Sequence, residues 1–238
     1  MDFKVYLQNY QPFVYKTFTN ARKNNKLAQT YLVKGNDGAP ILEVALFLAK
    51  SLVCESEDYL ACSNCLNCIR FEDNNYADFM LLDGNKQTLK VGDIELLQEF
   101  LSSSSMEKKG RKIYVINCLE NSNKETLNAL LKTLEEPHEN VYAFITTKNE
   151  NKLLPTILSR CQILNLLPSD RNSVKEEVLE KGVSIDDREI LSTLFTNVEA
   201  IMNNLEDETY KLCKDCLFDT LDALEQSTYK GLFYVQSE

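Results

Sequence analysis

Four cysteines lie within fifteen residues of the chain, at positions spaced C-x7-C-x2-C-x2-C: Cys54, Cys62, Cys65 and Cys68. Each x2 spacing lets two thiolates converge on one ion, and the x7 loop can bring the first cysteine round to close a tetrahedron. Because four sulfur ligands leave no open coordination position, the pattern predicts a structural Zn²⁺ site. An iron-sulfur cluster and a set of unconnected buried thiols are the alternatives.

The remaining cysteine and histidine candidates favour neither a second metal site nor a catalytic centre. Cys213 and Cys216 also have x2 spacing, but two ligands make half a site, and their surroundings have a helical pattern. They are interpreted as ordinary thiols of a helix. The only histidine, His138, follows Pro137 in an expected turn and lacks a nucleophile context, so we expect it at the surface.

A second pattern resembles a damaged phosphate loop after the expected strand 30–35. A working loop, G-x-x-x-x-G-K-[ST], wraps phosphates with backbone N–H groups, neutralises them with Lys and holds magnesium with a hydroxyl. Counted from Gly35, and with Gly38 inside the turn, this chain has Pro40 at the second Gly, Ile41 at the Lys and Leu42 at the hydroxyl. Three chemical roles are missing, and proline removes an N–H donor.

The acidic half of such a site is also missing. Its carboxylates would stand at the end of a following strand, here "KIYVIN", where the chain has Asn117 and Cys118. Neither side chain is an anionic metal ligand. We therefore expect no ATP in the chain's own site.

The elements that position these residues alternate between strand and helix. Expected strands are 30–35, 78–84, 112–118 and 140–147, and expected helices between them are 39–54, 91–104 and 124–136. Strands that alternate with helices predict an α/β fold with a parallel sheet covered on both faces. Ser122 and Glu125 have capping-box spacing at the start of the helix 124–136, and Pro137 ends it.

Composition and charge place limits on function. The 238 residues have a formal net charge of −10, which argues against tight autonomous binding to a polyanion. No apolar run is long enough for a signal peptide or a membrane span, so a cytoplasmic protein with reduced thiols is expected. Strand signals fade near residue 168. The expected domains are 1–167 (α/β), 168–208 (a small helical lid) and 209–238 (the start of a truncated or reduced helical collar).

Three ordered motifs carry a family resemblance: "NALLKTLEEP" (128–137), "AFITT" (143–147) and "KLLPTILSRCQIL" (152–164). With the cysteine insertion upstream, they resemble the AAA+ ATPase-fold subunits of the bacterial DNA polymerase III clamp loader over about residues 9–168. The resemblance implies an AAA+-type parallel-sheet domain with a zinc-binding insertion, followed by a small all-helical domain. The departures in the phosphate loop and at the strand end make it similar to the delta prime branch, which has lost the nucleotide site. The stretch "FTNVEAIMNNL" also lacks the nucleotide-sensing Arg of hydrolysing members.

The same resemblance implies a function in a complex. Arg160, in Ser159-Arg160-Cys161, matches the arginine finger that reaches a neighbouring subunit's ATP. The implied partners are the gamma/tau ATPases and delta, with the sliding clamp and primed DNA reached through the complex, and no membrane. The alternatives are an active clamp-loader ATPase with an atypical site, and an independent zinc-dependent DNA-binding module.

Overall fold

The computed structural model describes residues 2–36, 38–56, 58–135, 139–168, 171–195 and 198–226. The chain divides into two compact units, residues 1–168 and 169–238, and each is described by itself. Pro137 and His138 lie outside the described residues. Within the described residues, no helix is both long and apolar enough to cross a membrane.

Unit 1 is built on a five-stranded sheet with the order β2-β3-β4-β1-β5, in which every neighbouring pair is parallel. The strands are β1 (Thr30–Lys34), β2 (Phe79–Asp83), β3 (Lys112–Asn117), β4 (Val141–Thr147) and β5 (Gln162–Asn165). Every residue of β3 is buried, as expected for an inner strand covered on both faces. All five carboxyl ends lie at one edge of the sheet, where α/β folds place their ligands.

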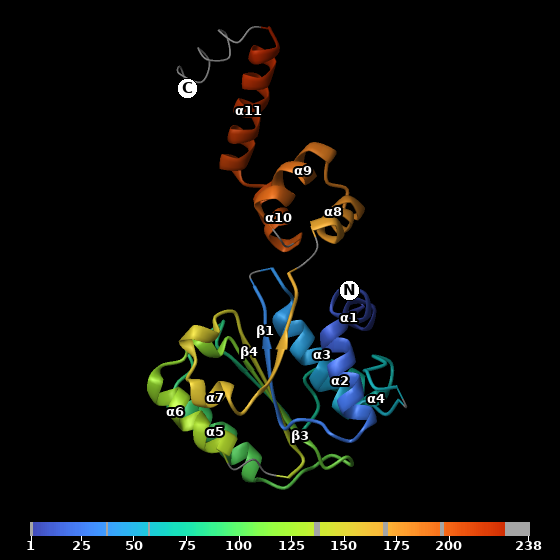
Figure 1. Ribbon diagram of the computed structural model, residues 1–238, viewed down its shortest axis with the longest axis vertical. Helices are drawn as coiled ribbons and strands as arrows, with labels where there is room; N and C mark the ends of the chain where they lie inside the picture. Colours follow the sequence, from blue (N-terminus) through green and yellow to red (C-terminus); the bar gives the residue numbers. More distant parts are fainter. Residues whose placement is uncertain are drawn as a thin grey trace. The chain divides into compact units, whose positions relative to one another are not determined.

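Helices cover both faces of this sheet (Figure 1). One face carries α1 (Phe3–Tyr10), α2 (Pro12–Lys23), α3 (Ile41–Val53) and α4 (Leu66–Glu72); the other carries α5 (Val91–Ser102), α6 (Lys124–Glu135) and α7 (Pro155–Leu158). The alternation along β1 separates the two cores, because Tyr31 and Val33 belong to the first and Leu32 to the second. The α/β fold class is therefore confirmed.

Helix α6 shows how local sequence sets an element's position. Leu127, Leu130 and Leu134 are buried on one face, as the i, i+3, i+7 spacing predicts. The predicted capping box at Ser122 is wrong. The backbone N–H of Thr126 donates instead to Asn123 Oδ1 at 2.8 Å, because the helix begins at Lys124 and the asparagine occupies the capping position.

Unit 2 is all helical in its described residues. Its helices are α8 (Arg171–Glu180), α9 (Ile185–Leu194), α10 (Val198–Leu205) and α11 (Glu208–Gln226). A small core includes Val178, Leu191 and Ile201. Asp187 on α9 binds α11 by accepting from Tyr210 Oη at 2.6 Å and from Lys214 Nζ at 2.7 Å.

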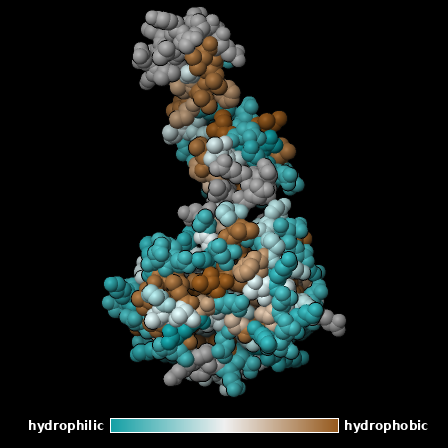
Figure 2. Space-filling model, in the orientation of Figure 1, coloured by the Kyte–Doolittle hydropathy of each residue, from teal (hydrophilic) through white to brown (hydrophobic). Residues whose placement is uncertain are grey.

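Helix α11 carries exposed apolar side chains, which gather along it in Figure 2. The leucines among them are Leu212, Leu217, Leu221 and Leu224. Cys213 and Cys216 also lie on this helix, the first exposed and the second partly buried. Packing therefore gives no account of Cys213.

Candidate metal centre and nucleotide edge

The four cysteines of the predicted metal site converge. Cys54 ends α3, Cys62 lies in the following loop, and Cys65 and Cys68 are at the start of α4. Their Sγ atoms all lie within 4.8 Å of one another, with 3.5 Å from Cys54 to Cys62 and 3.9 Å from Cys54 to Cys65. A tetrahedron with Zn–S bonds of about 2.3 Å has S···S edges of about 3.8 Å. The four thiols fit one metal ion.

Backbone N–H groups around the cluster donate hydrogen bonds to its sulfur atoms. The N–H groups of Cys62 and Ser56 donate to Cys54 Sγ at 3.3 and 3.4 Å. Backbone N–H groups of Asn64 and Cys65 lower the pKa of the Cys62 thiol to about 6. Burial raises the pKa of Cys54 and Cys68. Burial opposes deprotonation of Cys54 and Cys68, and a bound cation would hold all four cysteines as thiolates.

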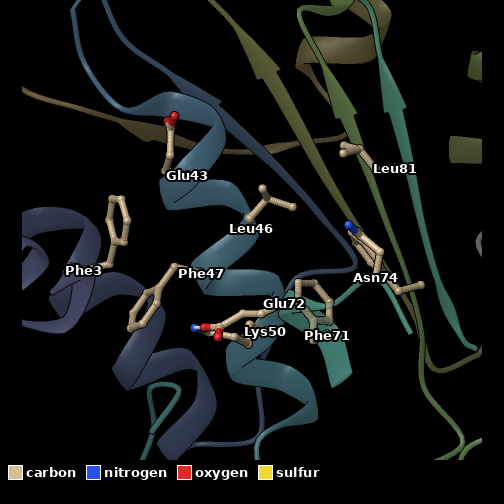
Figure 3. Close-up of a pocket in the computed structure, with 10 residues that line it drawn as sticks. Phe3, Glu43, Leu46, Phe47, Lys50, Phe71, Glu72, Asn74 and Leu81 are labelled. Carbon is tan, nitrogen blue, oxygen red and sulfur yellow. Dashed lines mark hydrogen bonds and ion pairs between the residues drawn. The ribbon is translucent and has the colours of Figure 1, made fainter. Parts of the chain in front are cut away.

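Lys50 of α3 attaches the cysteine-bearing segment to the fold. Its side chain is 9% exposed, and its Nζ donates to Ser63 Oγ at 2.8 Å and forms an ion pair with Glu72 of α4. Figure 3 shows the lysine and Glu72 together at one end of a cavity of about 350 Å³. The apolar part of the lining consists of Phe3, Leu46, Phe47, Phe71, Phe79 and Leu81. The charge of Lys50 is thus compensated within the segment.

The loop at the start of α3 is apolar where the phosphate-loop pattern has its ligands. Ile41 is 5% exposed and belongs to the first core, and Leu42 packs against the same core. Pro40 precedes the helix and makes no side-chain cap. Gly38 has a φ of 92°, in the left-handed region. A Cβ on Gly35 would lie 3.3 Å from Ile41 Cγ1, so the turn packs closely on the isoleucine side chain.

The end of β3 holds a hydrogen-bond network of mostly uncharged groups. Asn117 is 5% exposed; its Nδ2 donates to Asp83 Oδ1, and its Oδ1 accepts from Thr146 Oγ1, both at 2.7 Å. Thr146 Oγ1 in turn accepts from the Cys118 N–H at 3.0 Å. A Cβ on Gly84 would lie 2.7 Å from the Asn117 carbonyl oxygen. The network joins the ends of β2, β3 and β4, and only Asp83 in it is charged.

Sequence reasoning missed an ion pair at the same edge. Lys34, the last residue of β1, places its Nζ 2.7 Å from Glu150 Oε2, in a chain segment that follows β4. The pair borders a cavity of about 200 Å³, to which Gly35, Asn36 and Asn165 also contribute. The two charged residues are 116 positions apart, so no local pattern joins them.

Arg160 follows α7 on the surface. Its side chain is 36% exposed, and its Nη2 lies 3.0 Å from Oε1 of Glu135, which is 49% exposed. Its Nη1 donates to the Thr156 carbonyl oxygen at 2.9 Å. Ser159 Oγ donates to the same carbonyl at 3.0 Å. Cys161 packs against the second core, and burial raises its pKa to about 12.

The fold and the position of these features define an AAA+-type domain. The Thermotoga maritima RuvB Holliday junction branch migration motor has the same fold, with a TM-score of 0.52 at 15% identity over 97% of this chain and 68% of that chain. A family model described as "DNA polymerase III, delta subunit" matches residues 10–170. The chain belongs to this family, on its delta prime branch.

The chain is similar to delta' subunits and, over a shorter part, to a tau subunit. DNA polymerase III subunit delta' of Bacillus subtilis is 29% identical over 228 residues, which are 96% of this chain and 69% of that protein. The delta' subunit of Haemophilus influenzae is 27% identical over 73% of this chain and 56% of its own length. The tau subunit of Escherichia coli is 32% identical over 71% of this chain but only 26% of its own length.

Proposed function

We propose that the chain is a non-hydrolysing subunit of the bacterial DNA polymerase III clamp loader. In this proposal it joins gamma/tau ATPases and delta in a complex that loads the sliding clamp on primed DNA. It supplies Arg160 in trans to the ATP site of a neighbouring subunit. Membership of the delta prime branch supports the partners, and the site chemistry supports the division of roles.

The observation that carries the proposal is the contrast between Ile41 and Arg160. An ATP site needs a cation at the position of Ile41, and that side chain is part of the core. The carboxylate expected at the end of β3 is replaced by Asn117, whose amide already bonds to Asp83 and Thr146. The guanidinium, by contrast, is accessible from solvent.

The surroundings of Arg160 would let it exchange its ion pair with Glu135 for a contact with the neighbouring subunit's ATP. Its ion pair with Glu135 joins two partly exposed side chains, and such surface pairs contribute about 0–1 kcal/mol. A phosphate oxygen that gains charge in the transition state is a stronger acceptor for the planar, permanently charged fork. We infer that Glu135 holds the arginine ready and releases it when the neighbour binds ATP.

We propose that Cys54, Cys62, Cys65 and Cys68 hold one structural Zn²⁺. Their number and spacing favour zinc over an iron-sulfur cluster, and the centre has no place for substrate because all four positions are filled by sulfur.

Residues 168–208 are proposed as the lid and 209–238 as part of a collar, with the exposed leucines of α11 as its contact surface.

The test is ATP turnover by the complex reconstituted with cognate ATPase subunits, clamp and primed DNA. Arg160→Ala should assemble normally and lose most of the turnover that depends on this chain, since a finger contributes on the order of 10³-fold at the site it serves. Glu135→Ala is the matched control, because it removes the ion pair and keeps the finger. If equal incorporation of Arg160→Ala gives wild-type turnover, the arginine is structural and the finger proposal fails.

A further inference from the structure

The carboxyl end of α3, beside the cysteine cluster, is bound by an unusual number of cations. The last four carbonyl oxygens of an α-helix have no partner within the helix. Here four successive carbonyls each accept from a side chain. The donors are Arg22 to Ser51 (2.7 Å), Arg111 to Leu52 (3.1 Å), Asn67 to Val53 (3.2 Å) and Lys109 to Cys54.

Capping alone does not account for this composition. Neutral donors such as the Asn67 amide satisfy a carbonyl, and one cation suits the negative end of the helix dipole. Three full positive charges meet here instead, from α2 and from the segment that leads into β3. Like charges gathered at a partly buried site repel one another unless an anion compensates them.

Carboxylates supply little of that compensation. In the described parts of the chain, none of Arg22, Lys109 and Arg111 forms an ion pair, whereas nearby Lys50 is paired with Glu72. Burial and the charges of Arg111 and Arg22 lower the pKa of Lys109 more than the Glu55 carboxylate raises it. The four thiolates carry a formal charge of −4, and a divalent metal leaves a formal charge of −2. Lys109 donates to the carbonyl of Cys54, one of the four ligands. Arg22 also donates to the Tyr59 carbonyl, in the loop between Cys54 and Cys62, at 2.8 Å.

We propose that Arg22, Lys109 and Arg111 are the counter-charge of the metal centre, so that metal affinity depends on these three cations. This inference rests on the proposed metal site. The metal ion would in turn affect the three cations. A filled site attracts α2 and the segment before β3 onto the end of α3, whereas an empty site leaves three positive charges close together without an anion. The metal centre thereby fastens separate elements of the sheet domain as well as its own loop.

The test is the zinc dissociation constant of the full chain, measured by competition with a chromophoric chelator. Lys109→Met should weaken zinc binding by about tenfold or more, as is typical when groups that support metal ligands are removed. Lys108→Met is the matched control, since it removes the same charge from an exposed neighbouring position. Lys109→Arg should restore affinity close to that of the wild type, because it keeps the charge.

Arg22→Met, with Lys23→Met as its control, repeats the test from another element and guards against a folding defect at position 109. Unfolding is measured with and without zinc, because a simple helix cap destabilises both forms equally and a counter-charge destabilises the zinc-bound form more. Wild-type zinc affinity in both Lys109→Met and Arg22→Met overturns the inference and leaves the metal site intact. If the wild type binds no zinc, the metal-site proposal itself fails. This outcome differs from unchanged affinity in the variants, which overturns only the counter-charge inference.

Discussion

Helix α3 begins beside the loop that resembles a phosphate loop and ends at the cysteine cluster, about 20 Å away for its 13 residues. At its first turn, Ile41 packs into the core and Pro40 offers no cap. At its last turn, three cations and an amide satisfy the carbonyls, and Cys54 begins a four-thiol cluster. The amino end of α3 thus presents apolar side chains, and its carboxyl end presents cations and thiols.

The two ends of α3 differ in what stabilises them. A helix amino end that binds phosphate gains stability from its ligand, and an apolar replacement gains it from burial in every state. The carboxyl end has no such substitute for its four thiols: Leu60 and Ala61 of the loop are buried in the first core, but four thiolates this close together need a cation between them. We therefore expect substitutions at the two ends to differ in kind.

The largest expected effect is at the metal end. Cys68→Ser removes a buried ligand from α4 and should abolish stoichiometric zinc binding and lower the free energy of unfolding of unit 1 by about 4 kcal/mol or more. Denaturant unfolding with and without a chelator measures this, and the chelator should have no further effect on the variant. Cys213→Ser, on an exposed position of α11, is the control. Equal stability of Cys68→Ser and wild type would contradict a structural metal centre.

The second effect is at the amino end. Ile41→Lys restores the residue type of a working phosphate loop, yet it should destabilise unit 1 by about 3 kcal/mol, because it removes a buried aliphatic group and buries an amine. Thermal unfolding measures the change, with Ile41→Val as the milder control. A stable Ile41→Lys that binds ATP would show that the site is intact apart from one residue.

The third effect concerns the joined ends of β2 and β3, where Asn117 bonds to Asp83. Gly84→Ala should cost about 2 kcal/mol, because the new Cβ would lie 2.7 and 2.8 Å from the carbonyl oxygens of Asn117 and Cys118 and neither backbone can move freely. Gly92→Ala is the control, since nothing lies within 4 Å of a Cβ there. Unchanged stability of Gly84→Ala would mean that the ends of β2 and β3 are loosely joined.

The smallest perturbation needs no substitution. In metal-free protein at neutral pH, iodoacetamide should alkylate Cys62 much faster than Cys118, because backbone N–H groups lower the pKa of Cys62 to about 6 and burial raises that of Cys118. The thiolate fraction falls as pH drops through the pKa, so the Cys62 rate should fall below about pH 6. Peptide mass mapping gives both rates, and added zinc should protect Cys62. Similar alkylation rates for Cys62 and Cys118 would contradict the expected difference between their pKa values.

Sequence predicted the parts of this molecule that rest on local spacing. The alternation of apolar strands and amphipathic helices gave the parallel sheet, and short cysteine spacings gave a cluster that the structure brings within bonding range of one ion. Sequence alone does not predict strand β5, because its four residues are too few for a period-two pattern. The predicted cap at Ser122 lies one residue before the true cap at Asn123, since both are good capping residues.

The rest depends on contacts between distant segments. Lys34 meets Glu150 only because β1 and β4 are neighbours in the sheet. Lys109 and Arg111 reach the end of α3 from more than fifty positions away, and no charge pattern in the sequence joins them to the cysteines. Such juxtapositions follow from strand order, which the sequence alone does not fix.

The most direct test of the contrast between the two ends is native mass spectrometry of the purified full chain with zinc and Mg-ATP. We expect a chain with one zinc ion and no bound nucleotide at any ATP concentration that saturates a cognate ATPase subunit. A saturable ATP adduct would contradict the expectation for the amino end of α3, and a chain without metal would contradict the expectation for its carboxyl end.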